Sequence, residues 1–156
     1  MTQFGPSIRW RRALAVLIAA PIVLASCGTA SSPTPKPPVT VDVNLQEWAV
    51  VPGSAEVAAG EVTFAAKNTG PTDKHEMVVV KTDLGARGLA VKADGSADEE
   101  GTGVTMIGEI EEFAVGTSAS GAFTLTPGKY VLFCNIVDDD GDAHYAKGMS
   151  IDFTVK

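Results

Sequence analysis

The sequence predicts an all-β protein, a Greek-key antiparallel β-sandwich of about seven to eight short strands. Three observations support this fold class. Apolar residues alternate with polar ones in several short runs, and glycine, proline and asparagine separate these runs at regular intervals. No long helical period occurs after residue 39. A closed barrel is the alternative architecture, because it uses the same strand pattern.

The strands of the first half follow from this alternation. Val41, Val43 and Leu45 alternate with polar residues, which is typical of a half-buried strand. The run GEVTFAAKNTG at residues 60–70 repeats the pattern between turn residues. HEMVVVK at residues 75–81 predicts a third strand, which is more fully apolar than the first two.

The second half begins with an exception to the strand pattern. Residues 84–103 are rich in glycine and aspartate, and we expect a short helical turn or a mobile excursion there rather than a regular strand. Extended structure returns at residues 104–110 and at residues 113–115, and a further strand at residues 123–125 precedes the turn sequence TPG. In residues 130–134 the even-numbered positions share one face, and a last strand covers residues 149–155.

Residues 1–26 are identified as a secretory signal peptide. Three arginines precede an apolar run that is too short for a comfortable membrane span, and small residues end the segment. The sequence LASC, which ends at Cys27, resembles the lipobox of bacterial lipoproteins. This resemblance implies that Cys27 carries lipid and becomes the N-terminus. We therefore expect an extracytoplasmic protein that is anchored to the bacterial cell membrane through Cys27.

Residues 27–39 are interpreted as a tether, and residues 40–156 as one domain. In the tether proline alternates with small polar residues, a composition that stays extended and does not pack. The domain holds all 19 acidic residues but only eight of the 12 basic ones, which gives it a formal charge of −11. This charge favours a cation or a cationic partner, and we expect no nucleic-acid partner.

Four residues of the domain could together bind a metal ion: both histidines of the chain, His75 and His144, the domain's one cysteine, Cys134, and Met149. Each lies at a strand end or in a loop that follows a strand, and a sandwich gathers strand ends at one pole. Two imidazoles, a thiolate and a weak axial thioether are the ligands of blue-copper electron-transfer sites. Zinc is the competing metal, although its structural sites usually complete four ligands from cysteine and histidine alone.

Several short motifs occur in an order known from one protein family. They are GEVTF and NTG within residues 60–70, KHE at 74–76, PGKYVLFCN at 127–135 and HYAKGM at 144–149. Through these motifs the domain resembles the cupredoxins, the superfamily of plastocyanin and azurin, and more narrowly its single-domain bacterial members. The resemblance covers residues 40–156. It implies that His75, Cys134, His144 and Met149 bind one copper ion, which cycles between Cu(I) and Cu(II).

Two features depart from the family pattern. Glu76 follows the first histidine, where many cupredoxins have an asparagine that helps to tie the ligand loops together. Residues 135–143 separate Cys134 from His144, where the family often has only a few residues, and four of these nine are aspartates. An EF-hand begun at Asp138 lacks the required glycine and glutamate, so we interpret the acidic run as a solvated loop.

We expect an electron carrier rather than an enzyme. The protein supplies every ligand, which leaves no room to activate a substrate, and two histidines are too few for additional copper sites. A carrier would present the ring edge of His144 to its redox partner. The alternative is a copper-binding or copper-delivery protein for an extracytoplasmic oxidase, and a third hypothesis is an interaction module with incidental metal. A redox partner or a copper-accepting protein would have a basic docking surface.

Overall fold

The computed structural model describes Met1 and residues 37–156. The predicted signal peptide after Met1, the predicted lipid-bearing Cys27 and most of the tether lie outside the described residues. Within the described part, no helix is long and apolar enough to cross a membrane.

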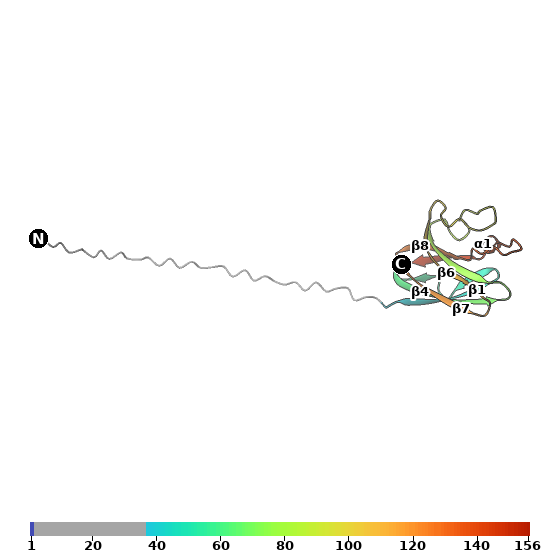
Figure 1. Ribbon diagram of the computed structural model, residues 1–156, viewed down its shortest axis with the longest axis horizontal. Helices are drawn as coiled ribbons and strands as arrows, with labels where there is room; N and C mark the ends of the chain where they lie inside the picture. Colours follow the sequence, from blue (N-terminus) through green and yellow to red (C-terminus); the bar gives the residue numbers. More distant parts are fainter. Residues whose placement is uncertain (2–36) are drawn as a thin grey trace. The chain divides into compact units, whose positions relative to one another are not determined.

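The described domain is built from strands and one short helix (Figure 1). The elements are β1 (Val39–Gln46), β2 (Ala49–Pro52), β3 (Glu56–Val57), β4 (Gly60–Gly70), β5 (His75–Thr82), β6 (Val104–Phe113), β7 (Ser118–Leu125), β8 (Gly128–Phe133), α1 (His144–Lys147) and β9 (Ser150–Val155). The alternation in the sequence predicted the longer strands. It missed β2, β3 and α1, which have two to four residues each and are too short to show a period.

The strands form two sheets that pack as a sandwich, which confirms the predicted fold class. One sheet has the order β2-β1-β4-β7 and the other has the order β3-β9-β8-β5-β6. The sheets are mixed, because β1 pairs with β4 and β3 pairs with β9 in parallel. Antiparallel pairing was expected from the sequence, and these two parallel pairs were not predicted. Apolar and polar residues alternate along a strand in the same way whether its neighbour is parallel or antiparallel.

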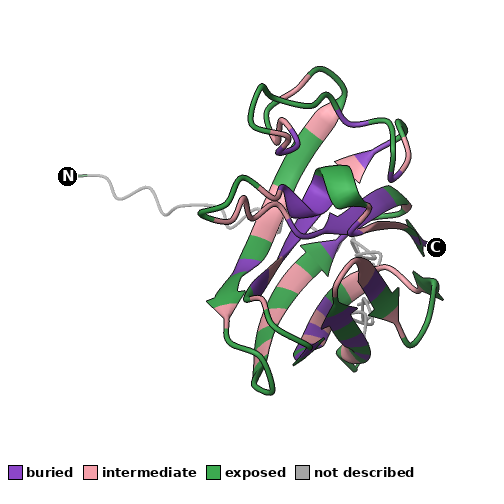
Figure 2. Cartoon of the chain, turned by 90° about the vertical axis from the view of Figure 1, so that its right-hand side faces the viewer, coloured by how far each residue is buried: buried purple, intermediate pink, exposed green. Residues whose placement is uncertain are grey.

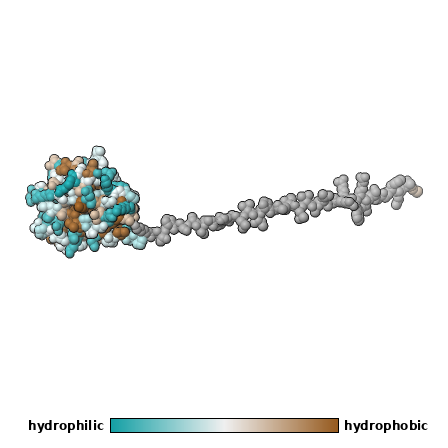
Figure 3. Space-filling view, turned by 180° about the vertical axis from the view of Figure 1, so that it is seen from behind, coloured by the Kyte–Doolittle hydropathy of each residue, from teal (hydrophilic) through white to brown (hydrophobic). Residues whose placement is uncertain are grey.

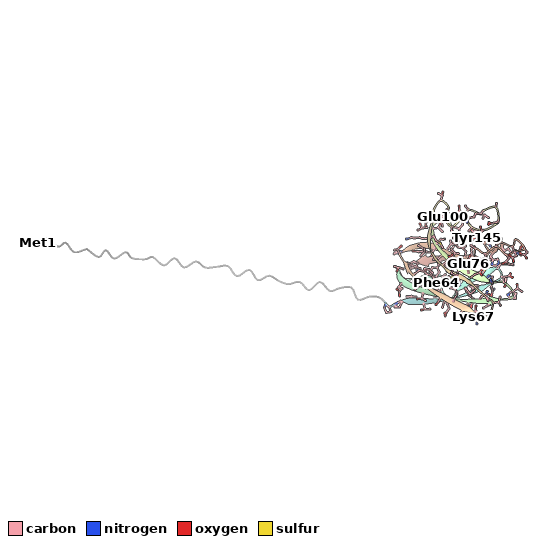
Figure 4. All side chains as sticks on the ribbon, in the orientation of Figure 1. Met1, Phe64, Lys67, Glu76, Glu100 and Tyr145 are labelled. Atoms are coloured by element: carbon pink, nitrogen blue, oxygen red, sulfur yellow. The ribbon has the colours of Figure 1, made fainter. Side chains whose placement is uncertain are left out.

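The main core lies between the two sheets. Buried and exposed residues alternate along several strands, which appears as coloured bands in Figure 2. Phe64 of β4 is fully buried inside the domain (Figure 4) and packs edge-on against Phe153 of β9, with ring centroids 5.4 Å apart. The even-numbered residues of 130–134 face this core, as predicted, together with Met149.

A second, smaller core covers the outer face of β5 and β8. Val78, Val131 and Phe133 point away from the sandwich interior and pack against Leu89 and Tyr145. The segment 84–103 supplies part of this cover, and an isolated β-bridge joins Val91 to Ala97 within it. The absence of a regular strand was predicted, but the segment is packed against the sheet rather than extended away from it.

Candidate metal centre

Four segments bring the predicted ligands to one end of the sandwich. His75 is the first residue of β5, Cys134 directly follows β8, His144 is the first residue of α1, and Met149 directly precedes β9. Because β5 and β8 are antiparallel neighbours, the start of β5 lies beside the end of β8. The chain then returns through the acidic loop to α1, which places both histidines next to the cysteine.

The strongest donor atoms lie within contact distance of one another. His75 Nδ1 is 3.3 Å from His144 Nδ1, while Cys134 Sγ is 3.2 Å from His144 Nδ1 and 3.9 Å from His75 Nδ1. All three side chains are completely buried. Two imidazole nitrogens and a sulfur atom therefore converge on one point inside the protein, as they must to bind a metal ion.

Met149 joins this group from the side of the core. Its carbonyl oxygen accepts a hydrogen bond from the backbone N–H of Cys134 at 3.0 Å, and its own N–H donates to the carbonyl oxygen of His144 at 3.0 Å. The Met149 side chain is fully buried in the same apolar cluster as Cys134. The structure thus brings all four predicted residues near one another.

Burial favours the uncharged forms of Cys134 and His75 when no cation is bound. Burial raises the pKa of the Cys134 thiol to about 12. Burial and the neighbouring His144 lower the pKa of His75 below its ordinary value. At neutral pH His75 therefore offers a neutral imidazole, whereas the thiol must release its proton when it binds a metal ion.

Polar side chains fix the segment that leads into His75. The buried Asn68 donates hydrogen bonds from Nδ2 to the carbonyl oxygens of Asp73 and Phe113, at 2.8 and 3.2 Å. Glu47 accepts a hydrogen bond at Oε1 from the backbone N–H of Asp73 at 2.7 Å. Because these bonds restrain the backbone two residues before His75, they limit how far its ring can move.

Glu76 ties together the two segments that contain His75 and Cys134. Its Oε1 accepts a hydrogen bond from the backbone N–H of Asn135 at 3.0 Å, and its own N–H donates to Cys134 Sγ at 3.5 Å. Burial raises the pKa of Glu76 to about 7, and nearby glutamates add to the shift. A carboxyl oxygen accepts hydrogen bonds in either protonation state. Glu76 can therefore link the two segments, as the asparagine at this position is expected to do in many cupredoxins.

Asn135 connects the candidate metal centre to segment 84–103. Its Oδ1 accepts from the backbone N–H of Ala97 at 2.6 Å, and its Nδ2 donates to the carbonyl oxygen of Ala97 at 3.0 Å. The same Nδ2 donates to Glu99 Oε1 at 2.8 Å. The segment 84–103 therefore holds the residue that follows Cys134, a role that its composition did not reveal.

The ring of His144 is enclosed, contrary to the expectation that its edge faces solvent. Its exposed fraction is 0%. Asp138 Oδ2 lies 2.8 Å from His144 Nε2, and the ring of Trp48 packs edge-on with centroids 4.9 Å apart. Sequence reasoning missed both neighbours, because any of the four aspartates could have turned inward and nothing linked Trp48 to this loop.

The domain is similar to solved structures that include two auracyanins and a rusticyanin. Auracyanin from the photosynthetic bacterium Roseiflexus castenholzii is 24% identical with a TM-score of 0.51, over 79% of this chain and 99% of that one. Auracyanin A, a "blue" copper protein of Chloroflexus aurantiacus, is 21% identical with a TM-score of 0.53, over 77% and 100%. Rusticyanin from Thiobacillus ferrooxidans is 16% identical with a TM-score of 0.51, over 76% and 77%.

These likenesses establish the fold of the domain. No protein-family model and no curated protein matches the sequence. The described domain nevertheless has the cupredoxin fold that the sequence motifs predicted. Within that fold, the group of two histidines, one cysteine and one methionine suits a copper ion by the softness of its donor atoms.

Proposed function

We propose that this protein is a membrane-tethered, extracytoplasmic electron carrier with one copper ion bound by His75, Cys134, His144 and Met149. The convergence of two Nδ1 atoms and one Sγ atom at a fully buried point carries the proposal. A copper ion held there would exchange single electrons between Cu(I) and Cu(II). The two histidines and the cysteine would hold it through two nitrogens and a sulfur, and the Met149 thioether would be a fourth, weaker ligand.

The surroundings of the centre favour electron transfer over catalysis. The ligand-bearing backbone is restrained by hydrogen bonds from Glu76 and Met149 on the cysteine side and from Asn68 before His75. Ligands that are held in this way move little when the metal changes valence. Burial of all three donor side chains also keeps them out of contact with solvent, which is expected of an electron-transfer centre rather than of a site open to substrate.

The copper-delivery alternative receives less support from the same contacts. Delivery needs a ligand that can open so that copper can pass to an acceptor. His144 is completely buried, and the acidic loop that would admit the metal instead places Asp138 against the ring. We therefore expect slow release of copper, which suits a resident cofactor better than a cargo.

The charge around the centre supports a basic partner. A hollow beside Asp138 is lined by three further acidic residues, Asp73, Glu112 and Asp139, and by one basic residue, Lys74. On the face seen in Figure 3, hydrophobic residues form separate spots among hydrophilic ones, which does not suggest a large apolar interface. A cationic surface would therefore dock through charge, and added salt would weaken its association.

The proposal is tested by loading the purified protein with Cu(II). We expect an intense visible absorption band from thiolate-to-copper charge transfer, together with a reversible one-electron wave in voltammetry. Copper uptake without such a band would mean that the Cys134 sulfur is not a ligand, and the proposed site would then be wrong.

The membrane tether is tested separately, in cells that export the protein. Cys27→Ser removes the sulfur that would carry the lipid, so we expect the protein to move from the membrane fraction to the soluble fraction. Mass spectrometry of the wild-type N-terminus would detect the acyl chains directly. An unchanged distribution, with no added lipid mass, would contradict an anchor at Cys27.

A further inference from the structure

The acidic insertion is a folded loop with its own hydrogen bonds. Val137 pairs with Ala143 in an isolated antiparallel bridge, and the backbone N–H of Asp138 donates to the carbonyl oxygen of Asp142 at 3.0 Å. The N–H of His144 donates to the carbonyl oxygen of Ile136 at 2.9 Å. These bonds fold the loop back on itself, so that the Asp138 carboxylate lies against the His144 ring.

A second contact of the His144 ring is made by Trp48. Trp48 packs edge-on against His144, and Lys147 Nζ lies 4.3 Å from the centroid of the Trp48 ring. Lys147 also forms an ion pair with Asp142 of the same loop. The loop therefore reaches His144 directly through Asp138, and indirectly through Asp142, Lys147 and Trp48.

We propose that Asp138 is a positioning residue, which holds His144 in the tautomer that binds metal through Nδ1. A neutral imidazole carries one hydrogen, and a carboxylate can only accept hydrogen bonds. Contact with Asp138 therefore places the hydrogen on Nε2 and leaves the Nδ1 lone pair directed toward Cys134, 3.2 Å away. This inference rests on the proposed copper site and adds a role for the inserted loop.

The same hydrogen bond explains a second acidic grouping near the ring. Asp73, Asp138 and His144 bring ligand atoms within 4.8 Å of one another. With a hydrogen on Nε2, this nitrogen has no lone pair for another cation. Asp138 then accepts a hydrogen bond from the proposed copper ligand His144. The group of Asp73, Asp138 and His144 is therefore part of the proposed copper centre and not a second metal site.

The experiment compares three variants. Asp138→Ala removes the acceptor. Asp138→Asn keeps an oxygen but adds a donor, so it no longer enforces one tautomer. Asp139→Asn is the matched control, because Asp139 is the exposed neighbour in the same loop. Far-UV circular dichroism checks that each variant folds. If Asp138→Ala does not fold, Asp138→Asn still provides the test.

The first readout uses the metal-free protein and is independent of copper. Nitrogen-15 NMR of the imidazole should show His144 with its hydrogen on Nε2 in the wild type and in Asp139→Asn. We expect a mixture of tautomers in Asp138→Ala, and an intermediate result in Asp138→Asn. A hydrogen on Nδ1 in the wild type, or an unchanged Asp138→Ala spectrum, would overturn the proposal.

The second readout uses the copper-loaded protein. Loss of a hydrogen-bonded partner of a metal-binding histidine typically weakens metal affinity about 10- to 100-fold, and we expect this loss in Asp138→Ala but not in Asp139→Asn. A tenfold loss for Cu(II) alone would raise the reduction potential by about 59 mV. Equal affinities in all variants would refute the positioning role. If the wild type binds no copper, the proposed function fails, while the NMR readout still decides the role of Asp138.

Discussion

Cys134→Ser is expected to abolish the visible absorption band of the copper-loaded protein. Cys134 Sγ lies 3.2 Å from His144 Nδ1 and 3.9 Å from His75 Nδ1, so it is the donor that would give the site its thiolate-to-copper transition. A serine hydroxyl is a hard, weakly acidic donor and does not replace a thiolate toward copper. The side chain changes little in size, and the N–H of Glu76, which donates to the sulfur, can donate to the new oxygen. We therefore expect a folded protein without colour.

The chain provides its own matched control, because it contains only one other cysteine, Cys27. Cys27→Ser should keep the visible band at full intensity. The measurement is a copper titration of both variants, followed by visible absorption and far-UV circular dichroism. A band that survives in Cys134→Ser, or one that disappears in Cys27→Ser, would show that the thiolate of this centre has been assigned to the wrong residue.

The four candidate ligands, which the structure brings near one another, were easier to pick out from the sequence than the groups that surround them. Rare residue types in a fixed order are visible in a sequence, and His75, Cys134, His144 and Met149 include both histidines and the one cysteine of the domain. Asp138 could not be chosen in this way, because its inward direction depends on how the loop folds back. The enclosure of His144 was missed for the same reason, and so was the contact with Trp48.

A similar division applies to the fold. Alternation predicted which faces of β1 and β4 are buried, because that pattern belongs to each strand alone. Which strands become neighbours depends on long-range packing, so the parallel pairing of β1 with β4 was not predicted. Segment 84–103 packs against the outer face of β5, which is apolar like the inner face. An apolar strand indicates that both of its faces are buried, but it does not indicate which segment of the chain covers the outer face.

Phe64→Ala is expected to lower the free energy of unfolding by about 3–5 kcal/mol. Phe64 is fully buried in β4, and its ring centroid lies 5.4 Å from that of Phe153 and 6.1 Å from that of Phe123. Removing the ring leaves a cavity between the two sheets. The surrounding strands cannot close it without breaking the backbone hydrogen bonds that pair them. Urea denaturation followed by circular dichroism would measure the change as a lower midpoint with an unchanged slope.

Val51→Ala is the control for this change, since it also removes apolar atoms from a strand. Val51 lies in the edge strand β2 and is 45% exposed, so we expect a change within about 0.5 kcal/mol. Copper would stabilise both variants, because it binds the folded protein and its binding free energy adds to the stability of that state. Equal midpoints for Phe64→Ala and Val51→Ala would contradict a core centred on Phe64, since only a ring that is packed between the sheets can leave a cavity there.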